Sequence, residues 1–303
     1  MKKILTIMLS LGLALALTGC KKKKLKVDLK DKGLCIGRSY ERYSWDIELK
    51  KWEPYEKDER IYDEKGNLLY DLTYIWKKKD KWTQLTHKKE YVYDDNGLLI
   101  KTLSSFDYSY NTLRENNQIE EFTYEGSTLK SKITRTKTLG VVDIETYAYD
   151  SKGNISTVIV EKNAGVPSYK KEYVYNESNL KTKVLYYEYD TKTQNYKDPI
   201  DCEKYEYDEK NNLITYYHVN TDQSINEIYW GSDYKEVSTY DEKNRRIETT
   251  GYILENGNAS IAAKYTYDYF DDGNRKSFTV STYLENEWIL RYKVIHTATI
   301  YDN

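Results

Sequence analysis

A short pattern of two tyrosines followed by a polar turn recurs along most of the chain and constrains its fold more than any other feature. One copy is Tyr147-Ala148-Tyr149-Asp150-Ser151-Lys152-Gly153-Asn154-Ile155, and close copies occupy 91–98 and 205–213. A spacing of two places both tyrosine rings on one face of a β-strand, where aromatic residues pack well. Asp and Gly then stand at the first and fourth positions of a tetrapeptide, which are the positions that a type I turn prefers. The pattern therefore predicts a β-hairpin.

The hairpin repeats along the chain. Its second tyrosine, taken as a marker, recurs at intervals of roughly 25 to 34 residues, and this spacing indicates a repeat architecture. The markers are Tyr62, Tyr93, Tyr124, Tyr149, Tyr175, Tyr207, Tyr240, Tyr267 and Tyr301. We expect a second reversal between successive copies, at 113–116, 254–257 and 284–287, and a cross-strand aromatic pair where Trp76 and Trp82 flank a polar turn. Two strands and two turns per repeat predict an all-β antiparallel meander of about 16 strands.

Residues 68–76 indicate how such a sheet is covered. The even positions are apolar or aromatic, whereas the odd positions include Asp71 and Thr73. One aromatic and one partly wet face are typical of an antiparallel sheet with one buried side. Because sheets of more than about ten strands curl or split, we expect an open shell or barrel-like sheet with a tyrosine-rich inner face.

Two other architectures are alternatives. An ordinary β-sandwich could also carry tyrosine-rich strands, but sandwiches do not usually have so regular an internal period. A membrane β-barrel would need an outward apolar band, whereas Lys and Glu are spread throughout this chain. The repeat pattern therefore favours the curled meander.

The first 19 residues predict a lipoprotein signal peptide. Met1-Lys2-Lys3 is a short basic segment, and the almost wholly apolar run at 4–17 is too short for a membrane span. Leu17-Thr18-Gly19-Cys20 resembles the bacterial lipobox. The resemblance implies cleavage before Cys20, a diacylglyceride on its thiol, and acylation of the new amino terminus. Two or more acyl chains would hold the protein on a membrane.

Beyond the signal peptide the chain divides into a tether and a repeat domain. Residues 20–27 comprise the lipidated cysteine and a lysine-rich segment, which is either a solvated tether or a contact to anionic head groups. Residues 28–303 form the repeat domain. Near its start Trp45, Ile47 and Leu49 alternate, which predicts a strand in a divergent capping repeat.

The Tyr-x-Tyr-Asp-x-x-Gly-Asn-Leu pattern resembles the YD repeat of rearrangement-hotspot (Rhs) proteins and teneurins, and also YD-like repeats of secreted bacterial surface proteins. The resemblance covers about 56–303 and implies β-hairpin repeats that form a curved sheet. There are departures. Turn length is expected to change at 125–127 and 268–273, and Arg245 replaces an apolar or small residue. The sequence shows no toxin domain and no self-cleaving carboxy-terminal cassette.

Little in the sequence indicates catalytic chemistry. The histidines His87, His218 and His296 are far apart, and each is interpreted as a strand residue rather than a ligand. The acidic turns at 94–97 and 271–273 lack the ligand spacing of a calcium loop. We therefore expect no enzymatic activity, no cofactor and no metal, and Cys20 is the one modification site.

Cys35 and Cys202 could pair in an oxidising envelope, but nothing in the sequence places them near each other.

These observations predict a non-catalytic, lipid-anchored protein of the bacterial cell envelope, expected at the outer membrane. Its leading role is a surface scaffold or a binding module for protein or polysaccharide, because tyrosines left on a surface offer rigid amphipathic contact area. The alternative is a toxin-enclosing or secretion-accessory β-shell. The formal net charge of −2 argues against a nucleic-acid partner.

Overall fold

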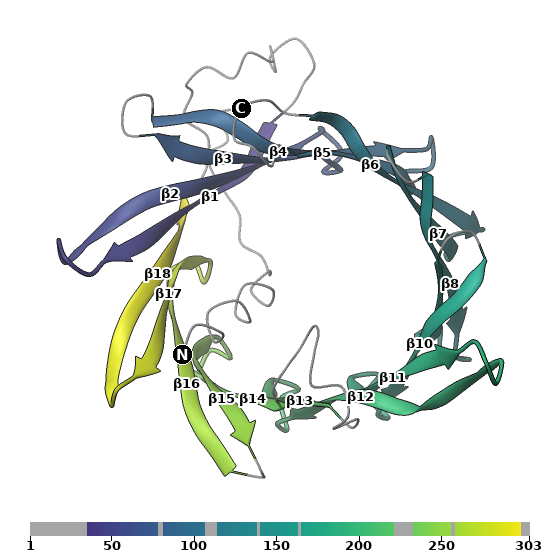
Figure 1. Cartoon of the computed structure of the whole chain (residues 1–303). Coiled ribbons are helices and arrows are strands. Elements are labelled where there is room, and N and C mark those ends of the chain that lie inside the picture. The colour runs from purple at the N-terminus through teal and green to yellow at the C-terminus, as the bar shows by residue number, and fades with distance from the viewer. Residues whose placement is uncertain are drawn as a thin grey trace.

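The protein is a single antiparallel β-sheet closed into a barrel, as the computed structural model in Figure 1 shows. The structure describes residues 35–77, 81–106, 114–137, 140–162, 165–220, 233–255 and 258–297. The described strands are β1 (Cys35–Asp46), β2 (Lys51–Tyr62), β3 (Leu68–Lys77), β4 (Lys81–Tyr93), β5 (Leu99–Phe106), β6 (Arg114–Glu125), β7 (Thr128–Thr136), β8 (Gly140–Tyr149), β9 (Ile155–Lys162), β10 (Val166–Tyr175), β11 (Lys181–Asp190), β12 (Asn195–Tyr207), β13 (Leu213–Asn220), β14 (Asp233–Tyr240), β15 (Arg246–Glu255), β16 (Asn258–Tyr269), β17 (Arg275–Leu284) and β18 (Glu287–Thr297).

The predicted meander is confirmed, with 18 described strands in place of about 16. Each strand pairs with the next along the chain, and β1 pairs with both β2 and β18, so the sheet has no free edge. The register at the closure runs from Ser39↔Thr297 to Ser44↔Tyr292. In an open sheet β1 and β18 would be edge strands whose unpaired backbone N–H and C=O groups could pair with other chains. Closure pairs these groups with each other.

The turn chemistry read from the motif is confirmed. In the first copy the amide of Asp63 donates to the carbonyl of Asn67 (2.9 Å), and the amide of Gly66 donates to the carbonyl of Asp63 (3.1 Å). The fourth turn position has positive φ whether it is Gly66 (85°) or Asn179 (62°), which is why only these residue types occur there. The Asp63 carboxylate accepts the amides of Lys65 and Asn67, so the aspartate closes its own turn.

Two of the expected departures have a simple explanation. Phe270 takes the place of the turn aspartate, and its amide and carbonyl make the usual bonds to Asn274 and Gly273. Turn length is therefore unchanged at 270–274, and the marker tyrosine of this copy is Tyr269 rather than Tyr267. The second of these departures is in the turn at 241–245. Arg245 stands where copies such as 150–154 have asparagine, and its guanidinium donates to the Asp241 carboxylate (2.7 Å). The copy at 125–127 does have a shorter turn, since β6 ends at Glu125 and β7 begins at Thr128.

The marker tyrosines tie each hairpin to the one before it. From Tyr93 to Tyr269, the hydroxyl donates to the backbone carbonyl at or next to the start of the preceding hairpin's second strand, as in Tyr149 to Leu129 (2.7 Å) and Tyr175 to Ile155 (3.0 Å). The same bond runs from Tyr93 to Leu68, Tyr124 to Leu99, Tyr207 to Lys181, Tyr240 to Leu213 and Tyr269 to Arg246. In seven repeats, therefore, a side-chain hydroxyl ties the backbone of one hairpin to the next.

Aromatic pairs stabilise hairpins at the opposite end of the barrel. Trp45 packs against Trp52 with ring centroids 5.1 Å apart, and equivalent pairs are Tyr189–Tyr196 and Tyr283–Trp288. The predicted register of Trp76 opposite Trp82 is confirmed. The reversals at 254–257 and 284–287 are confirmed as well, because β15 and β17 end within them.

Two local predictions at this end are wrong. Strand β1 ends at Asp46, so Ile47 and Leu49 lie in an exposed turn and not on a strand. The Asp46 carboxylate accepts the amide of Leu49, which ends the strand early. Residues 114–116 belong to β6 and not to a turn.

Cross-strand partners share a face, so the registers divide the side chains into two faces around the whole barrel. Most buried side chains lie on one of them, namely Asp58, Thr102, Ser104, Thr134, Val158, Val160, Val184, Tyr216, Ser238, Thr249, Ala263, Phe278, Val280 and Val294. Side chains converge on the concave side of a curved sheet, so this is the inner face. It carries the first motif tyrosines, including Tyr91, Tyr147 and Tyr205, which confirms the tyrosine-rich inner face.

Strand β3 departs from the expected arrangement. Its aromatic side, with Tyr70 and Tyr74, faces outward, whereas Asp71 and Thr73 face inward beside Arg60 and Asp58. Alternation along a strand separates two faces but does not say which one is concave.

An apolar cluster lies next to the closure. Phe278, Val280 and Val294 are its buried members, and Tyr40 from β1 packs against them together with Tyr265, Tyr267 and Tyr292. Residues from both ends of the sequence therefore share one core, which stabilises the closed form.

Candidate functional site

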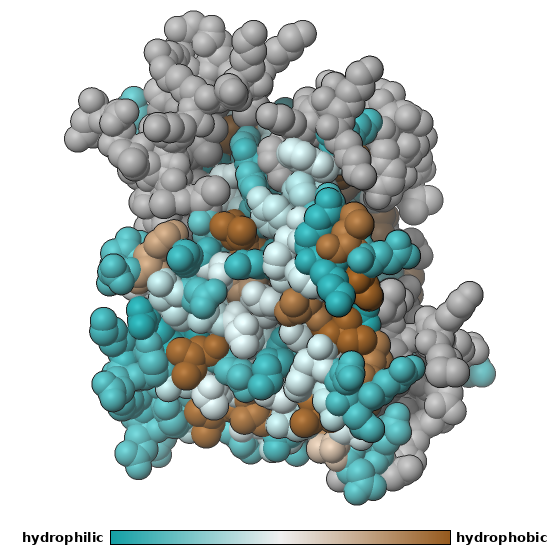
Figure 2. Space-filling model, turned by 90° about the vertical axis from the view of Figure 1, so that its left-hand side faces the viewer, coloured by the Kyte–Doolittle hydropathy of each residue, from teal (hydrophilic) through white to brown (hydrophobic). Residues whose placement is uncertain are grey.

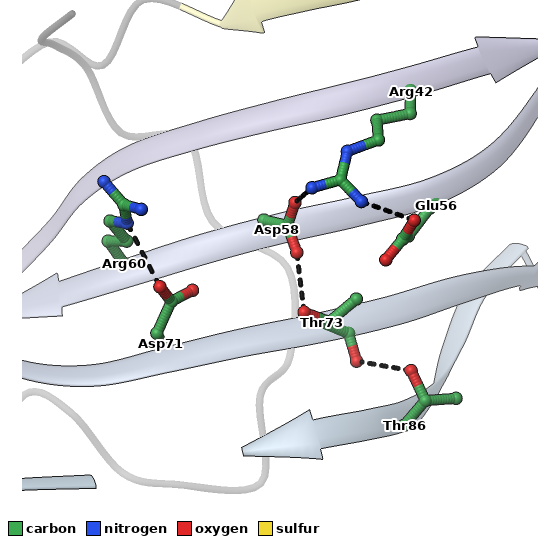
Figure 3. A network of polar contacts seen from close by, with 7 residues as sticks. All are labelled: Arg42, Glu56, Asp58, Arg60, Asp71, Thr73 and Thr86. Atoms are coloured by element: carbon green, nitrogen blue, oxygen red, sulfur yellow. Dashed lines mark hydrogen bonds and ion pairs between the residues drawn. The ribbon is translucent and has the colours of Figure 1, made fainter. Parts of the chain in front are cut away.

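The candidate site is the inner face of the barrel, and its first part is a network of charges on β1, β2 and β3. Figure 3 shows Arg42 between two carboxylates, with Glu56 at 2.5 Å and Asp58 at 2.6 Å. The Thr73 hydroxyl donates to Asp58 (2.6 Å), and Arg60 pairs with Asp71 (3.2 Å). The register places these groups side by side, because Asp58 is opposite Thr73 and Arg60 is opposite Asp71.

The ionic contacts continue along the next strands. Lys89 on β4 reaches across β5 to Glu120 on β6 (2.8 Å), and Thr102 donates to the same carboxylate (2.7 Å). Lys132 on β7 then bridges Glu120 (3.7 Å) and Glu145 (2.6 Å). We call the inward side chains from Arg42 to Glu145 the charged half of the inner face.

The inner face from β10 to β16 is the tyrosine half. It presents Tyr169, Tyr173, Tyr186, Tyr205, Tyr216, Tyr234 and Tyr265. Glu203 accepts the hydroxyls of Tyr186 (2.6 Å) and Tyr205, and Glu236 accepts that of Tyr234 (2.9 Å). Bonds to carboxylates fix the orientation of the rings.

Electrostatics keep these hydroxyls protonated. Burial raises the pKa of Tyr186, Tyr205 and Tyr234, and the carboxylates of Glu203 and Glu236 raise it further. Lys171 lies 5.2 Å from the ring centre of Tyr186, and Lys181 lies 4.2 Å from that of Tyr205. The tyrosine half therefore offers fixed rings, neutral hydroxyls and scattered charges, a combination suited to binding rather than to nucleophilic chemistry.

Asp58 gives the charged half a pH dependence. Its side chain is 5% exposed, and burial raises its pKa to about 6 although Arg42 and Thr73 act in the opposite direction. An aspartate in an unfolded chain has a pKa of about 3.9. Because the folded protein holds this proton more tightly, ionised Asp58 lowers stability above about pH 6, and that loss disappears as the pH falls towards about 4.

We expect Asp58→Asn to remove this dependence. Between pH 7 and pH 4.5 the free energy of unfolding of the native protein should rise relative to the variant, by on the order of 2 kcal/mol. Denaturant titration at several pH values measures the difference. Glu48→Gln, in an exposed turn, is the control and should track the native protein. A variant curve parallel to the native one would show that Asp58 does not titrate in this window.

The three histidines lie on three different strands, β4, β13 and β18. His87 on β4 stacks on Phe106, with ring centroids 4.7 Å apart, and burial lowers its pKa. Burial opposes the charge on His218, but the bond to Asp201 (2.8 Å) together with the charges of Asp201, Glu203 and Asp233 outweighs burial and raises the pKa of His218. His296 lies beside Tyr40 at the closure. No group of three or more His, Cys, Asp or Glu among the described residues is placed to hold a metal ion.

The remaining predicted positions have mixed outcomes. Cys202 is a buried free thiol on β12, so it is not paired with Cys35. The lipidation site Cys20, the signal peptide and the tether lie outside the described residues. The Asp94 and Asp272 carboxylates of the acidic turns accept turn amides, as the turn interpretation requires.

Sequence reasoning missed the charged half. Arg42, Glu56 and Asp58 look like ordinary strand charges in the sequence. A β-bulge shifts the register of β1 against β2 between Arg42 and Tyr43, so simple alternation does not predict which of these charges meet. The one available signal was a pair of oppositely charged residues on either side of the turn at 63–67, Arg60 and Asp71, although a bulge between Ile61 and Tyr62 makes their spacing from that turn differ by one residue.

The fold and its inner face define a closed meander barrel built from hairpin repeats. No protein-family model matches the chain, and no curated protein matches it. Among solved structures it is similar to a porin-like protein from Bacteroides uniformis, at 11% identity over 86% of this chain and 96% of that chain, with a TM-score of 0.44. It is also similar to a porin-like protein from Bacteroides vulgatus, at 11% identity over 85% of this chain and 96% of that chain, with a TM-score of 0.37.

A third similarity is to TcdB2-TccC3 without its hypervariable C-terminal region. The identity is 15%, the TM-score is 0.29, and the match covers 82% of this chain but 15% of that chain. All three likenesses are too distant to carry a functional argument.

Proposed function

We propose that the chain is a lipid-anchored, non-catalytic protein of the bacterial cell envelope whose barrel binds a polysaccharide or a protein segment. The observation that carries the proposal is the inner face, where fixed tyrosine rings face a belt of paired charges. Tyrosine gives a rigid apolar surface with a polar tip, so it can cover a sugar ring or a side chain while bonding at its edge. The paired charges add donors and acceptors that fix orientation.

Membrane attachment in this proposal comes from lipid on Cys20 and not from the sheet. Charged residues occupy mid-strand positions of the outer face, including Lys57, Glu59, Lys88, Glu90, Lys101, Glu121, Lys170, Glu172, Lys183 and Lys204. Figure 2 shows hydrophobic residues on one side of the barrel as separate patches among hydrophilic ones. A lipid-facing barrel needs a continuous apolar band about 25 Å tall. The described residues contain no helix long and apolar enough to span a membrane.

The anchor is tested by metabolic labelling with palmitate. We expect the native protein to take up label and to sediment with membranes, because two or more acyl chains bind a bilayer almost irreversibly. Cys20→Ala should lose both properties. Label retained by the variant, or a native protein without label, would contradict the anchor.

The binding role is tested with the soluble form that begins at Leu25. We expect it to retain a glycan from an oligosaccharide array or a protein from an envelope extract. Tyr186→Ala and Tyr216→Ala should weaken retention, whereas Tyr252→Ala on the outer face should not. If neither glycans nor proteins are retained, the barrel is a scaffold. Recovery of a single toxin-like protein would favour the enclosing shell instead.

A further inference from the structure

A cleft opens at the rim of the barrel, between the first two motif turns. It has a volume of about 710 Å³ and is lined by both turns, 63–67 and 94–97, and by the tyrosines Tyr70, Tyr91 and Tyr93. Its size falls within the range of sites for small organic ligands, roughly 300–1,000 Å³. The cleft lies at the end of β3 and β4, apart from the charged half described above.

The cleft exists because neighbouring hairpins separate near their turns. The ladder between β3 and β4 ends at Tyr70↔Glu90, so the last residues of β4 have no partner in β3. The hydroxyl of Tyr93 donates to the carbonyl of Leu68 (3.0 Å) and holds the two hairpins together below the gap. The space between the turns stays open above that bond.

Between two later pairs of neighbouring turns, an asparagine pair bridges the equivalent space. The side-chain amide of Asn154 donates to Asn179 in the next turn (3.0 Å), and that of Asn212 donates to Asn244 (3.3 Å). Asn154 and Asn212 stand at the fifth position of their turns, and their acceptors stand at the fourth position of the following turn. In the first pair of turns the donor position is Asn67, but the acceptor position is Gly97. The acceptor side chain is therefore missing between the first two turns.

The groups that line the cleft suit a ligand rich in hydroxyls. The carboxylates of Asp63 and Asp94 accept amides of their own turns, and Glu90 pairs with Lys88 (3.1 Å). These carboxylates are partnered, so the cleft is not a simple cation site. The amide of Asn67 and the ammonium of Lys65 add donors beside these acceptors. A sugar hydroxyl both donates and accepts, and an aromatic ring can cover the apolar face of a sugar.

We propose that this cleft binds one sugar residue of a glycan, with the ring against Tyr91 and Tyr93, which share the inner face, and the hydroxyls against Asn67 and Lys65. The proposal rests on the binding function proposed above and assigns polysaccharide as the ligand class and the rim as a point of contact.

Gly97→Asn tests the proposal by introducing the acceptor side chain that bridges the two later pairs of turns. Asparagine occupies the same turn position at Asn179, Asn211 and Asn244, with φ of 62°, 65° and 59°, so the backbone accepts it. A Cβ built at Gly97 meets nothing within 4 Å. Gly153→Asn is the matched control, because that glycine has a similar φ of 86°, also has free space around it, and lies in another turn.

The probe is an array of soluble oligosaccharides, followed by titration calorimetry of the soluble form with the tightest binder. We expect Gly97→Asn to weaken binding at least tenfold and Gly153→Asn to leave it unchanged, with equal melting temperatures. Lys65→Ala, in the exposed part of the turn, should also weaken binding without affecting folding and serves if Gly97→Asn does not fold.

The outcomes separate this inference from the function on which it rests. Binding that survives both Gly97→Asn and Lys65→Ala would overturn the rim site and leave the inner face as the binding surface. Absence of binding to every oligosaccharide would overturn the glycan assignment at the rim, and protein binding would then be the remaining role of the barrel.

Discussion

Replacing Phe278 with alanine is expected to lower the free energy of unfolding by about 3 to 4 kcal/mol. Phe278 is buried on the inner face and packs with Val280 and Val294. Its ring also contacts Tyr267 and Tyr292, at centroid distances of 6.0 and 6.2 Å. Truncation removes these contacts and leaves a cavity next to the closure, where the sheet on both sides is held by its ladders and cannot collapse freely.

Denaturant titration of the soluble form measures this loss. Phe278→Leu keeps most of the volume and should lose about 1 to 1.5 kcal/mol. Val166→Ala is the surface control, since Val166 is 51% exposed, and it should change stability by less than about 0.5 kcal/mol. A loss below about 1 kcal/mol for Phe278→Ala would mean that the cluster at the closure is not packed as described.

Removing three marker hydroxyls at once is expected to cost about 3 kcal/mol. In the triple variant Tyr149→Phe, Tyr175→Phe, Tyr207→Phe, each change deletes one bond to a backbone carbonyl, at 2.7, 3.0 and 2.8 Å. A hydrogen bond to a carbonyl contributes about 1 kcal/mol, and more where the carbonyl is left unsatisfied. The three sites are in successive repeats about 10 Å apart, so their effects should be nearly additive.

The matched control is Tyr217→Phe, Tyr252→Phe, Tyr283→Phe. The hydroxyls of these tyrosines make no hydrogen bond to the described residues, so the triple control should stay within about 0.5 kcal/mol of the native protein. Single variants show whether the three losses add. Equal stabilities of the two triple variants would mean that the marker tyrosines do not join the repeats.

The local part of the fold could be predicted from the sequence because each hairpin is specified within a few residues. The turn is specified by an aspartate that accepts amides of its own turn and by a glycine or asparagine at positive φ. Copies such as 63–67 and 150–154 therefore adopt the same turn with the same backbone bonds. The position of the turn at 270–274 was mispredicted because Phe270 stands where aspartate is expected. The backbone bonds that define this turn do not depend on that side chain.

The global part could not be predicted for physical reasons. Closure depends on the twist and bend that accumulate over all the strands, to which the bulges beside the turns contribute, for example between Ile61 and Tyr62 and between Ala148 and Tyr149. The same accumulation decides which face is concave, so Tyr70 points outward although it looks like a core residue. The network of Arg42 and Asp58 follows from a bulged register that the sequence does not display.

The central claim is that the meander closes through β1 and β18, and a distance between spin labels tests it directly. Labels at Glu41→Cys and Ile295→Cys, outward-facing partners across the closure, are placed in the soluble form with Cys35 and Cys202 replaced by serine. The pair Glu41→Cys and Lys57→Cys, on strands β1 and β2 that are adjacent whether or not the sheet closes, is the control.

A closed barrel predicts a distance below about 20 Å for both pairs, since neighbouring strands lie ~4.8 Å apart and the labels add their own length. In an open sheet β1 and β18 would be the two edges, separated by many strand spacings, and the first pair would then lie beyond about 40 Å while the control stayed short. That second result would contradict the closed barrel.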